Sequence, residues 1–271
     1  MARYGYATER IGRAVHPAAE PLGDSFMSWF DVATQERSVK EGLVRPCNTC
    51  AVRDHSVCAS LDAPEQTRVV QIMTQIDFAE GATIFDESTP ANHVFNITTG
   101  GVKVYKLLPD GRRAITGFLF PGDFLGLTHQ DVYAFSAEAI SATKLCRFPR
   151  EKLERLIEEM PTLEHRLLGL ASHELAAAQD QMLLLGRKTA KERLASFLLL
   201  ISNAARRHGH PGNPIELTMG RNDIGDYLGL TIETVSRTFS LLKREGLIRL
   251  LDGNRIQIAK LDELQELAGV I

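Results

Sequence analysis

The sequence contains no apolar run long enough to cross a membrane. A transmembrane helix needs about 20 consecutive apolar residues, and no such run occurs among the 271 residues. The N-terminus also lacks the apolar core of about 7 to 15 residues that marks a secretory signal peptide. The composition, 44% hydrophobic and 24% charged, is that of a soluble globular protein large enough for two cores. We therefore predict a cytoplasmic protein with no membrane partner.

Cysteine is also scarce, because the chain has only four. Cys47, Cys50 and Cys58 lie close together in RPCNTCAVRDHSVCAS, whereas Cys146 lies far downstream. In a reducing compartment, so few cysteines favour metal binding or redox chemistry over a disulfide framework. A zinc site completed by Cys146 or by His55 and a thiol redox switch both remain open at this point, and Cys146 alone could be a buried strand thiol.

The net charge is small and negative, −3, which alone would argue against a nucleic-acid partner. The average conceals a division along the chain. Residues 187–250 contain 11 Lys and Arg against 6 Asp and Glu, a local charge of +5 that leaves −8 for the remainder. This distribution suits a DNA-binding domain attached to an acidic sensor, although solvated helix faces often carry a similar excess.

Residues 1–40 show no sustained periodicity, and we predict a mobile extension there. From 78 to 148, short runs with strand character alternate with turn signals. The runs are ATIFDE, HVFNI, GVKVYKLL, ITGFLF, FSAEAI and TKLCRF, and a Pro109-Asp110-Gly111 turn separates the third from the fourth. Runs of this kind need a two-layer β core, which predicts an antiparallel barrel or jelly roll.

After Pro149 the hydrophobic period changes from two to about three and a half. One stripe of a long helix is predicted to carry Leu168, Ala171, Leu175, Ala178, Met182 and Leu185, which recur at spacings of three or four. Such a stripe fits a helix packed on its own core as well as a dimer interface, and its small alanines would permit close approach of a partner helix. A second helix is predicted from Ala190 to about Arg206, after a break at Gly186.

The segment RNDIGDYLGLTIETVSRTFSLLKREGLIRL has the pattern of a helix-turn-helix. We predict helices over 221–228 and 232–245, with Gly229 permitting the turn and Gly225 letting the helices approach. The sequence LIRLLDGNRIQI then predicts two short strands that form a wing.

Three side chains of the second helix are candidates for reading DNA. Glu233, Ser236 and Arg237 stand at i, i+3 and i+4, so they share one exposed face. Arg can fork onto guanine, Glu can accept from cytosine, and Ser can reach either kind of base edge. The alternative is a surface salt bridge worth under about 1 kcal/mol, and the position near the start of the recognition helix favours base reading instead.

The stretches ETVSRTFSLLKREGLI and NDIGDYLGL closely resemble the DNA-binding region of the CRP/FNR superfamily of bacterial transcription regulators, and Glu233, Ser236 and Arg237 resemble its FNR-type form. The resemblance extends over roughly residues 46–269. It implies an α+β protein that is not an enzyme. Its expected parts are a cluster-binding segment and β-roll (jelly-roll, cyclic-nucleotide-binding-like) sensor domain over 41–160, a dimerisation helix over 161–187, and a winged helix-turn-helix domain over 188–271.

The resemblance also implies a sensing chemistry. FNR-type proteins hold an oxygen-labile 4Fe-4S cluster, and Cys47, Cys50, Cys58 and Cys146 match its ligands, with a Cys50 to Cys58 spacing similar to that of a rhizobial-type variant. Members of the CRP type bind cyclic AMP through an arginine on the phosphate. The corresponding stretch, 122–141, contains no Lys or Arg, so cyclic nucleotide is rejected as a ligand.

The resemblance implies a homodimer that binds inverted TTGAT-like half-sites of double-stranded DNA when oxygen is low. It also implies that the turn around Pro109-Asp110-Gly111, with Arg112 and Arg113, contacts RNA polymerase. FNR-type proteins carry an acidic residue in the helix seam where this chain has Ala178, so the cluster-free form is predicted to retain some dimer. An iron-sulfur oxidoreductase is disfavoured, because no nucleotide-binding glycine motif or acid/base constellation occurs. Besides a regulator with a zinc or redox site and an iron-sulfur oxidoreductase, a third alternative is a protein-interaction module that uses the helix stripe and binds no DNA.

Overall fold

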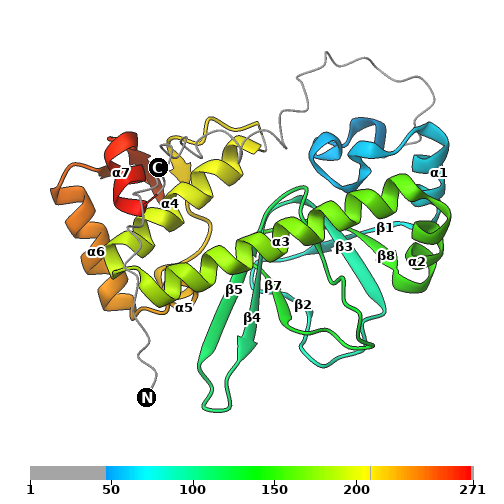
Figure 1. Cartoon of the computed structure of the whole chain (residues 1–271), viewed down its shortest axis with the longest axis horizontal. Helices are drawn as coiled ribbons and strands as arrows, with labels where there is room; N and C mark the ends of the chain where they lie inside the picture. Colours follow the sequence, from blue (N-terminus) through cyan, green and yellow to red (C-terminus); the bar gives the residue numbers. More distant parts are fainter. Residues whose placement is uncertain (1–46, 208, 270–271) are drawn as a thin grey trace, which may run out of the picture. The chain divides into compact units, whose positions relative to one another are not determined.

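The computed structural model describes residues 47–207 and 209–269 (Figure 1). The mobile extension predicted for residues 1–40 lies outside the described residues. None of the described helices combines the length and apolar character that a membrane span requires.

The described part begins with three single-turn 3-10 helices, which together with their connections (residues 47–60) we call the cysteine segment. They are η1 (Cys47–Thr49), η2 (Arg53–His55) and η3 (Val57–Ser60), and the helix α1 (Ala63–Ile72) follows them. Asp62 begins α1 with a reciprocal capping box, in which its carboxylate accepts from the Glu65 amide and the Glu65 carboxylate accepts from the Asp62 amide. The sequence analysis did not predict α1.

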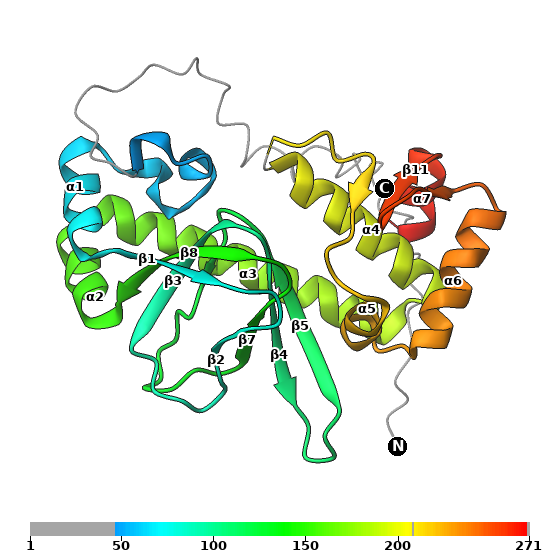
Figure 2. The same cartoon turned by 180° about the vertical axis from the view of Figure 1, so that it is seen from behind.

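The β-roll consists of two antiparallel sheets packed face to face (Figures 1 and 2). One has the order β1 (Thr74–Phe78), β8 (Thr143–Pro149), β3 (His93–Thr99), β6 (Phe124–Leu125), and the other β2 (Thr83–Phe85), β7 (Ser136–Ala139), β4 (Val102–Leu107), β5 (Arg113–Leu119). Ile97 and Leu145 of the first sheet and Val102 of the second are at most 1% exposed in the shared core. The predicted jelly roll is therefore confirmed, and β1 and β6 are additions to it.

Three helices follow the β-roll. They are α2 (Arg150–Glu159), the long α3 (Pro161–Arg187) and α4 (Ala190–Arg207). One face of α3 is buried, because Leu163, Leu167 and Leu184 pack into the protein cores. The predicted break at Gly186 lies two residues later, since α3 continues to Arg187.

The last part is a winged helix. It contains α5 (Arg221–Leu228), α6 (Ile232–Arg244), α7 (Leu261–Ala268) and a sheet of β9 (Ile215–Glu216), β11 (Arg255–Ile258) and β10 (Ile248–Leu250). The turn between α5 and α6 depends on Gly229, whose φ of 62° lies in the left-handed region. Gly225 is needed for close approach, because a Cβ there would lie 2.7 Å from the Leu230 carbonyl oxygen.

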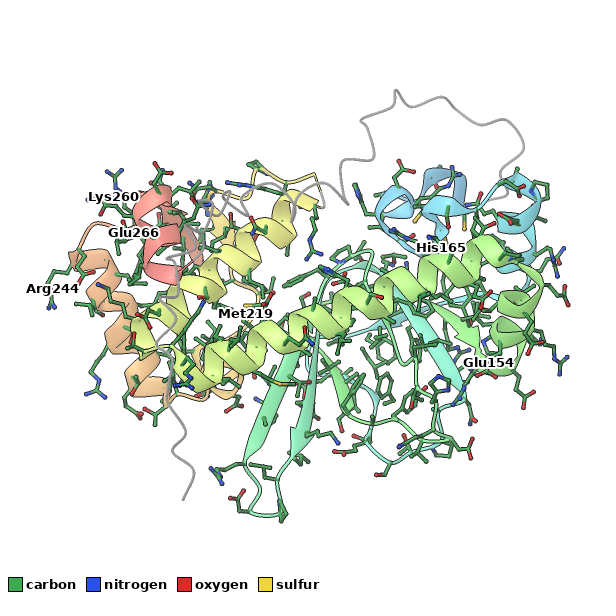
Figure 3. All side chains as sticks on the ribbon, viewed as in Figure 1. Glu154, His165, Met219, Arg244, Lys260 and Glu266 are labelled. Atoms are coloured by element: carbon green, nitrogen blue, oxygen red, sulfur yellow. The ribbon has the colours of Figure 1, made fainter. Side chains whose placement is uncertain are left out.

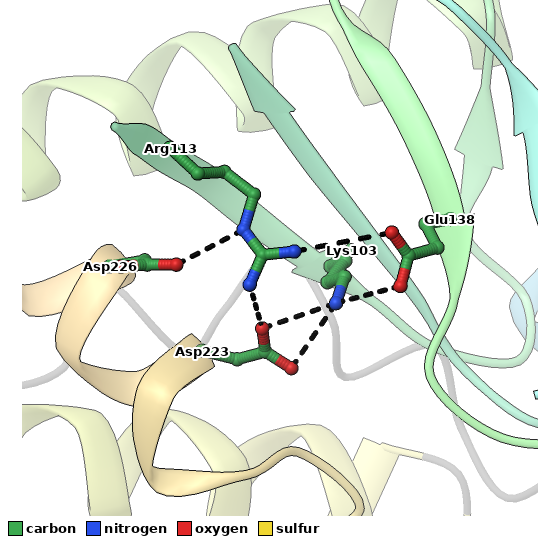
Figure 4. A network of polar contacts seen from close by, with 5 residues as sticks. All are labelled: Lys103, Arg113, Glu138, Asp223 and Asp226. Atoms are coloured by element: carbon green, nitrogen blue, oxygen red, sulfur yellow. Dashed lines mark hydrogen bonds and ion pairs between the residues drawn. The ribbon is translucent and has the colours of Figure 1, made fainter. Parts of the chain in front are cut away.

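A network of five charged side chains joins the β-roll to α5 (Figure 4). Lys103 of β4 is 7% exposed and lies 3.1 Å from Asp223 and 2.9 Å from Glu138. Arg113 of β5 lies 2.5 Å from Asp223 and 3.0 Å from Asp226. We call these five residues the charge network. Since Asp223 and Asp226 belong to α5, the network ties the first helix of the helix-turn-helix to strands β4, β5 and β7 of the β-roll.

Aromatic rings reinforce the same contact. Phe118 of β5 lies 6.0 Å from Phe197 of α4 and 5.3 Å from Tyr227 of α5, measured between ring centroids. Phe118, Phe197 and Tyr227 belong to one hydrophobic core that includes residues of both parts. Apolar packing therefore joins the β-roll to α4 and α5 beside the charge network.

Candidate metal centre and DNA-reading helix

All four cysteines line one cavity. Three come from the cysteine segment and Cys146 comes from β8. The other lining residues are Arg53, Ser56, Gln66, Val69, Val70, Met73, Asn96 and Phe148. The cavity has a volume of about 20 Å³, which is room for about one water molecule. The fold thus brings Cys146 to the same cavity as Cys47, which lies nearly a hundred residues earlier in the sequence.

The alternation of β8 explains why Cys146 faces this cavity. Leu145 points into the core between the two sheets, whereas Cys146 and Phe148 point to the opposite face, where Phe148 packs against α1, α2 and the cysteine segment. Asn96 of β3 lies directly opposite Cys146 in the antiparallel register, so the two side chains share that face.

The four cysteines are free thiols, and the pKa values of Cys47, Cys58 and Cys146 are raised. Burial, together with the neighbouring thiols, raises the pKa of Cys58 to about 11 and that of Cys146 to about 12, and burial raises the pKa of Cys47. Arg53 opposes the shift at Cys47 and Cys58. In the form described here the three thiols stay protonated at neutral pH, and a metal that binds them as thiolates must displace the protons.

Several buried polar atoms around the cavity have no hydrogen-bond partner. They are Nε2 and Oε1 of Gln66, Oδ1 of Asn96 and Nε of Arg53. A buried polar atom without a partner costs about 1 to 3 kcal/mol, so their concentration beside the cysteines marks a site. Sequence reasoning missed Gln66 and Asn96. The one available signal was Asn96 itself, a polar residue inside the apolar run HVFNI.

The thiols are not arranged around a single point. Among the described residues, no three His, Cys, Asp or Glu side chains stand close enough together to hold one metal ion. A zinc site requires four donors at about 2.0 to 2.3 Å from one centre. His55, the alternative fourth zinc ligand, is exposed and does not line the cavity.

The predicted DNA-reading residues lie on the exposed face of α6. Glu233, Ser236 and Arg237 are all exposed, whereas Val235 and Phe239 on the opposite face are buried. The helix is capped by Thr231, whose hydroxyl accepts from the Thr234 amide. Arg237 and Glu233 are not among the ion pairs closer than 4 Å in the described ranges. Both side chains are thus directed at solvent from the first turns of the helix.

Basic residues frame the same helix. Arg244, the last residue of α6, projects outward from the winged helix (Figure 3). It is preceded by Lys243, which is also exposed. Cations at this end of a helix complement its dipole and can also meet the phosphates of nucleic acid.

The predicted dimer stripe is the exposed face of α3. Leu168, Leu175 and Met182 are 64%, 61% and 68% exposed, and Leu185 is 40% exposed. Ala171 and Ala178 are exposed between them. Within the described residues the stripe is therefore not part of the core of its own chain, which removes one of the two explanations of the pattern. A contiguous apolar stripe of this kind marks an interaction surface.

The turn between β4 and β5 separates the two arginines that were predicted to act together. Arg112 is 76% exposed and pairs with Asp110 at 2.7 Å within the turn. Arg113 points instead into the charge network and is only 26% exposed. The exposed part of the predicted polymerase contact is therefore limited to the turn and Arg112.

Comparisons with known proteins match both halves of the described chain. A family model for the Crp-like helix-turn-helix domain matches residues 192–267, and one for the cyclic nucleotide-binding domain matches residues 75–160. The nitrogen fixation regulation protein FixK of Bradyrhizobium diazoefficiens is 44% identical over 207 residues, covering 76% of this chain and 87% of FixK. The transcriptional activator protein Anr of Pseudomonas aeruginosa is 35% identical over 226 residues, covering 82% of this chain and 92% of Anr.

A solved structure is similar over the same region. The structure of FixK2 from Bradyrhizobium japonicum has a TM-score of 0.68 and 40% identity, and the match covers 72% of this chain and 97% of FixK2. The two matched domains contain Cys146 and the three exposed residues of α6.

Proposed function

Because the chain belongs to the CRP/FNR family of DNA-binding transcription regulators, we propose that it is an oxygen-responsive activator of the FNR type. In this proposal it holds a 4Fe-4S cluster and binds DNA as a homodimer when oxygen is low. The observation that carries it is the convergence of Cys47, Cys50, Cys58 and Cys146 on one cavity. The members of the CRP/FNR family are transcription regulators and not enzymes.

The donor set of the cavity suits such a cluster. Four thiolates are the ligands that one 4Fe-4S cluster takes, and unpartnered NH groups beside them suit its sulfur atoms. The enclosed space of about 20 Å³ has room for about one water molecule, so the cysteine segment would have to move outward to admit a cluster. The cluster supplies the reactivity toward oxygen. The chain's own part is to bind it with thiolates and to shield it from water with Phe148 and α1.

A shift of the cysteine segment acts directly on the helix that bears the dimer stripe. Val57 and Cys58 of η3 belong to the same hydrophobic core as Leu163 and Leu167 of α3. Arg166 of α3 donates to the Ser56 carbonyl at 3.4 Å. A movement of the cysteine segment on cluster binding would therefore alter how the N-terminal half of α3 packs, and with it how the stripe would meet a second copy.

The exposed face of α6 supplies the DNA specificity. Each protomer reads one TTGAT-like half-site, and the two inverted half-sites are centred about one helical turn, roughly 34 Å, apart. Arg237 donates to guanine and Glu233 accepts from the paired cytosine, while Ser236 bonds a neighbouring base edge. The turn at 108–112 contacts RNA polymerase. Cyclic nucleotide is not the effector, since residues 122–141 of the matched cyclic nucleotide-binding domain contain no Lys or Arg to meet a phosphate.

Anaerobic purification tests the proposal directly. We expect about four iron and four acid-labile sulfide per chain and a brown colour that bleaches in air. If the purified protein is colourless and contains one zinc per chain, the cavity is a zinc site and not a cluster site. If the protein contains no metal and its DNA affinity responds to thiol oxidants, the cysteines form a redox switch and hold no cluster.

A further inference from the structure

Gln66 is a buried amide with nothing to bond. It lies on α1 with a relative exposure of 1%, and neither its Nε2 nor its Oε1 has a partner. Val69 and Val70 of the same helix line the same cavity, so the amide is set in apolar surroundings. A leucine at this position would satisfy the packing without the cost of an unpaired amide.

Asn96 repeats this situation from the other wall. It is 2% exposed on β3, directly opposite Cys146, and its Oδ1 has no partner. Its Nδ2 lies 3.4 Å from the Ile97 carbonyl oxygen, which is at the long end of a hydrogen bond. Two carboxamides from different elements thus meet the cavity that the four cysteines line: Gln66 has no partner at either polar atom, and Asn96 has one long hydrogen bond and an unpartnered Oδ1.

We propose that the NH2 groups of Gln66 and Asn96 donate hydrogen bonds to the sulfur atoms of the 4Fe-4S cluster and its thiolates, an assignment that rests on the proposed function. The sulfurs are acceptors that the described cavity lacks, and they carry the negative charge of the site. Donors at these sulfurs orient the ligands, strengthen their binding and raise the reduction potential of the cluster. Arg53, whose Nε is also unpartnered, adds a cation on the side of the cysteine segment.

The amides have opposite effects on the two forms of the protein. In the cluster-free form the Gln66 NH2 group has no partner and the Asn96 NH2 group makes only a long hydrogen bond to the Ile97 carbonyl, so both amides destabilise the fold. In the loaded form their NH groups donate to the sulfurs and stabilise the cluster. A residue with a purely structural role would change the stability of both forms in the same direction. The sign of the effect in each form therefore separates the two roles.

The variants are Gln66→Leu and Asn96→Leu, and Gln75→Leu is the matched control. Gln75 lies opposite Cys146 on the other neighbouring strand, β1, but it is exposed and does not line the cavity. Three quantities are measured without oxygen: the midpoint of thermal unfolding of the cluster-free protein, the rate of iron release from the loaded protein to a chelator, and the reduction potential of the cluster.

We expect both cavity variants to raise the unfolding midpoint of the cluster-free form, to weaken cluster retention by about 10- to 100-fold, and to lower the reduction potential. The Gln75→Leu protein should match the wild type in cluster retention and potential. Loaded variants with the potential and iron-release rate of the wild type would overturn the assignment, as would a destabilised cluster-free form. Wild-type protein without iron and sulfide would instead show that the proposed function itself is wrong.

Discussion

The residues proposed to read DNA and those proposed to hold a cluster differ in how much water surrounds them. Arg237 is exposed in the first half of α6, so its guanidinium can form new hydrogen bonds with a partner. Cys146 is partly buried, and its pKa is raised to about 12. Its thiol therefore becomes a reactive thiolate only when a metal displaces the proton or a base removes it. Exposure therefore suits recognition at the surface, and burial suits the holding of a group inside the protein.

Replacing Arg237 with alanine should remove discrimination at one base pair. Arg237 is the side chain on this face that can fork onto guanine, so Arg237→Ala should cost about 1 to 3 kcal/mol on the preferred site and little on a site with that base pair changed. Competition binding with the two duplexes measures the difference. Arg244→Ala is the control, because it removes the same charge from the exposed end of α6 and should weaken both duplexes alike.

Equal losses on the two duplexes for Arg237→Ala would show that Arg237 contacts phosphate rather than a base. Loss of discrimination in Arg244→Ala as well would place base reading farther along α6.

Sequence spacing could identify the cysteines but not the amides beside them. The C-x2-C-x7-C pattern is visible in the sequence because the ligands are chemically distinctive. Gln66 and Asn96 are ordinary residue types, and their meaning depends on burial and on which atoms lack partners. Those properties arise only when α1, β3 and β8 pack together. The same holds for Arg113, which looked like the second half of an exposed pair and instead faces α5.

Helix α3 has two apolar faces with different roles. Leu163, Leu167 and Leu184 hold it to its own chain, whereas Leu175 and Met182 of the stripe remain more than half exposed. An apolar stripe at a spacing of three and four is what a parallel helix pair buries. The two faces allow the helix to respond to the cysteine segment on one side and to a partner on the other.

The stripe should allow dimers even without the cluster. Ala178 places no charge in the seam, so air-treated protein should dimerise measurably at micromolar concentration. Ala178→Asp should shift it to monomer, because two carboxylates would meet in a low-dielectric seam. Sedimentation of both proteins, with and without cluster, measures the effect. Ala177→Asp is the control, since it adds the same charge to an exposed position of α3 outside the stripe.

An air-treated wild type that is wholly monomeric would contradict this prediction. It would mean that the cysteine segment alone sets the dimerisation of α3.

The turn of the helix-turn-helix should not tolerate a side chain at Gly225. A Cβ there would lie 2.7 Å from the Leu230 carbonyl oxygen, and backbone cannot move aside easily. Gly225→Ala should therefore lower the free energy of unfolding by about 1 to 3 kcal/mol. Gly186→Ala is the control in another helix, where a Cβ meets nothing within 4 Å, and it should be neutral or stabilising. Urea unfolding measures both, and equal stabilities would show that the turn can open.

Elements with strong local signals were predictable, and short elements were not. The turn at Gly229 and the periodic face of α6 depend on residues within one short segment, so their positions can be predicted from the sequence. Strand β6 has only two residues, Phe124 and Leu125, and exists because β3 lies beside it. Helix α1 could have been found, because its Asp62 and Glu65 capping box is readable before an apolar run.

At the scale of the whole described chain, the sensor and the DNA-reading domain share one core. Phe118 of the β-roll packs with Phe197 of α4 and Tyr227 of α5, and Gln181 of α3 donates to the Tyr227 carbonyl at 2.9 Å. A change in the β-roll or in α3 therefore reaches α5 without crossing a flexible linker. The charge network determines where on the β-roll α5 is held, because its ion pairs require specific partners.

Breaking the charge network should loosen α5. Arg113→Gln removes the partner of Asp226 and one partner of Asp223. The cost should be about 1 to 3 kcal/mol, above that of an exposed ion pair and below that of a fully buried one. We expect faster amide hydrogen exchange in α5 and lower DNA affinity. The control is Glu245→Gln, since Glu245 is 37% exposed against 33% for Asp226 and pairs with Lys191 of α4, away from the β-roll.

A double-mutant cycle decides whether Arg113 and Asp226 interact directly. Asp226→Asn alone should cost less than Arg113→Gln, because Asp226 has one partner in the network and Arg113 has three. The double variant should cost clearly less than the sum of the two single changes, since the second change removes a contact that is already lost. Additive costs would show that the two side chains do not interact directly. If Arg113→Gln also left amide exchange in α5 at the wild-type rate, the aromatic contacts of Phe118 would hold α5 without the charges.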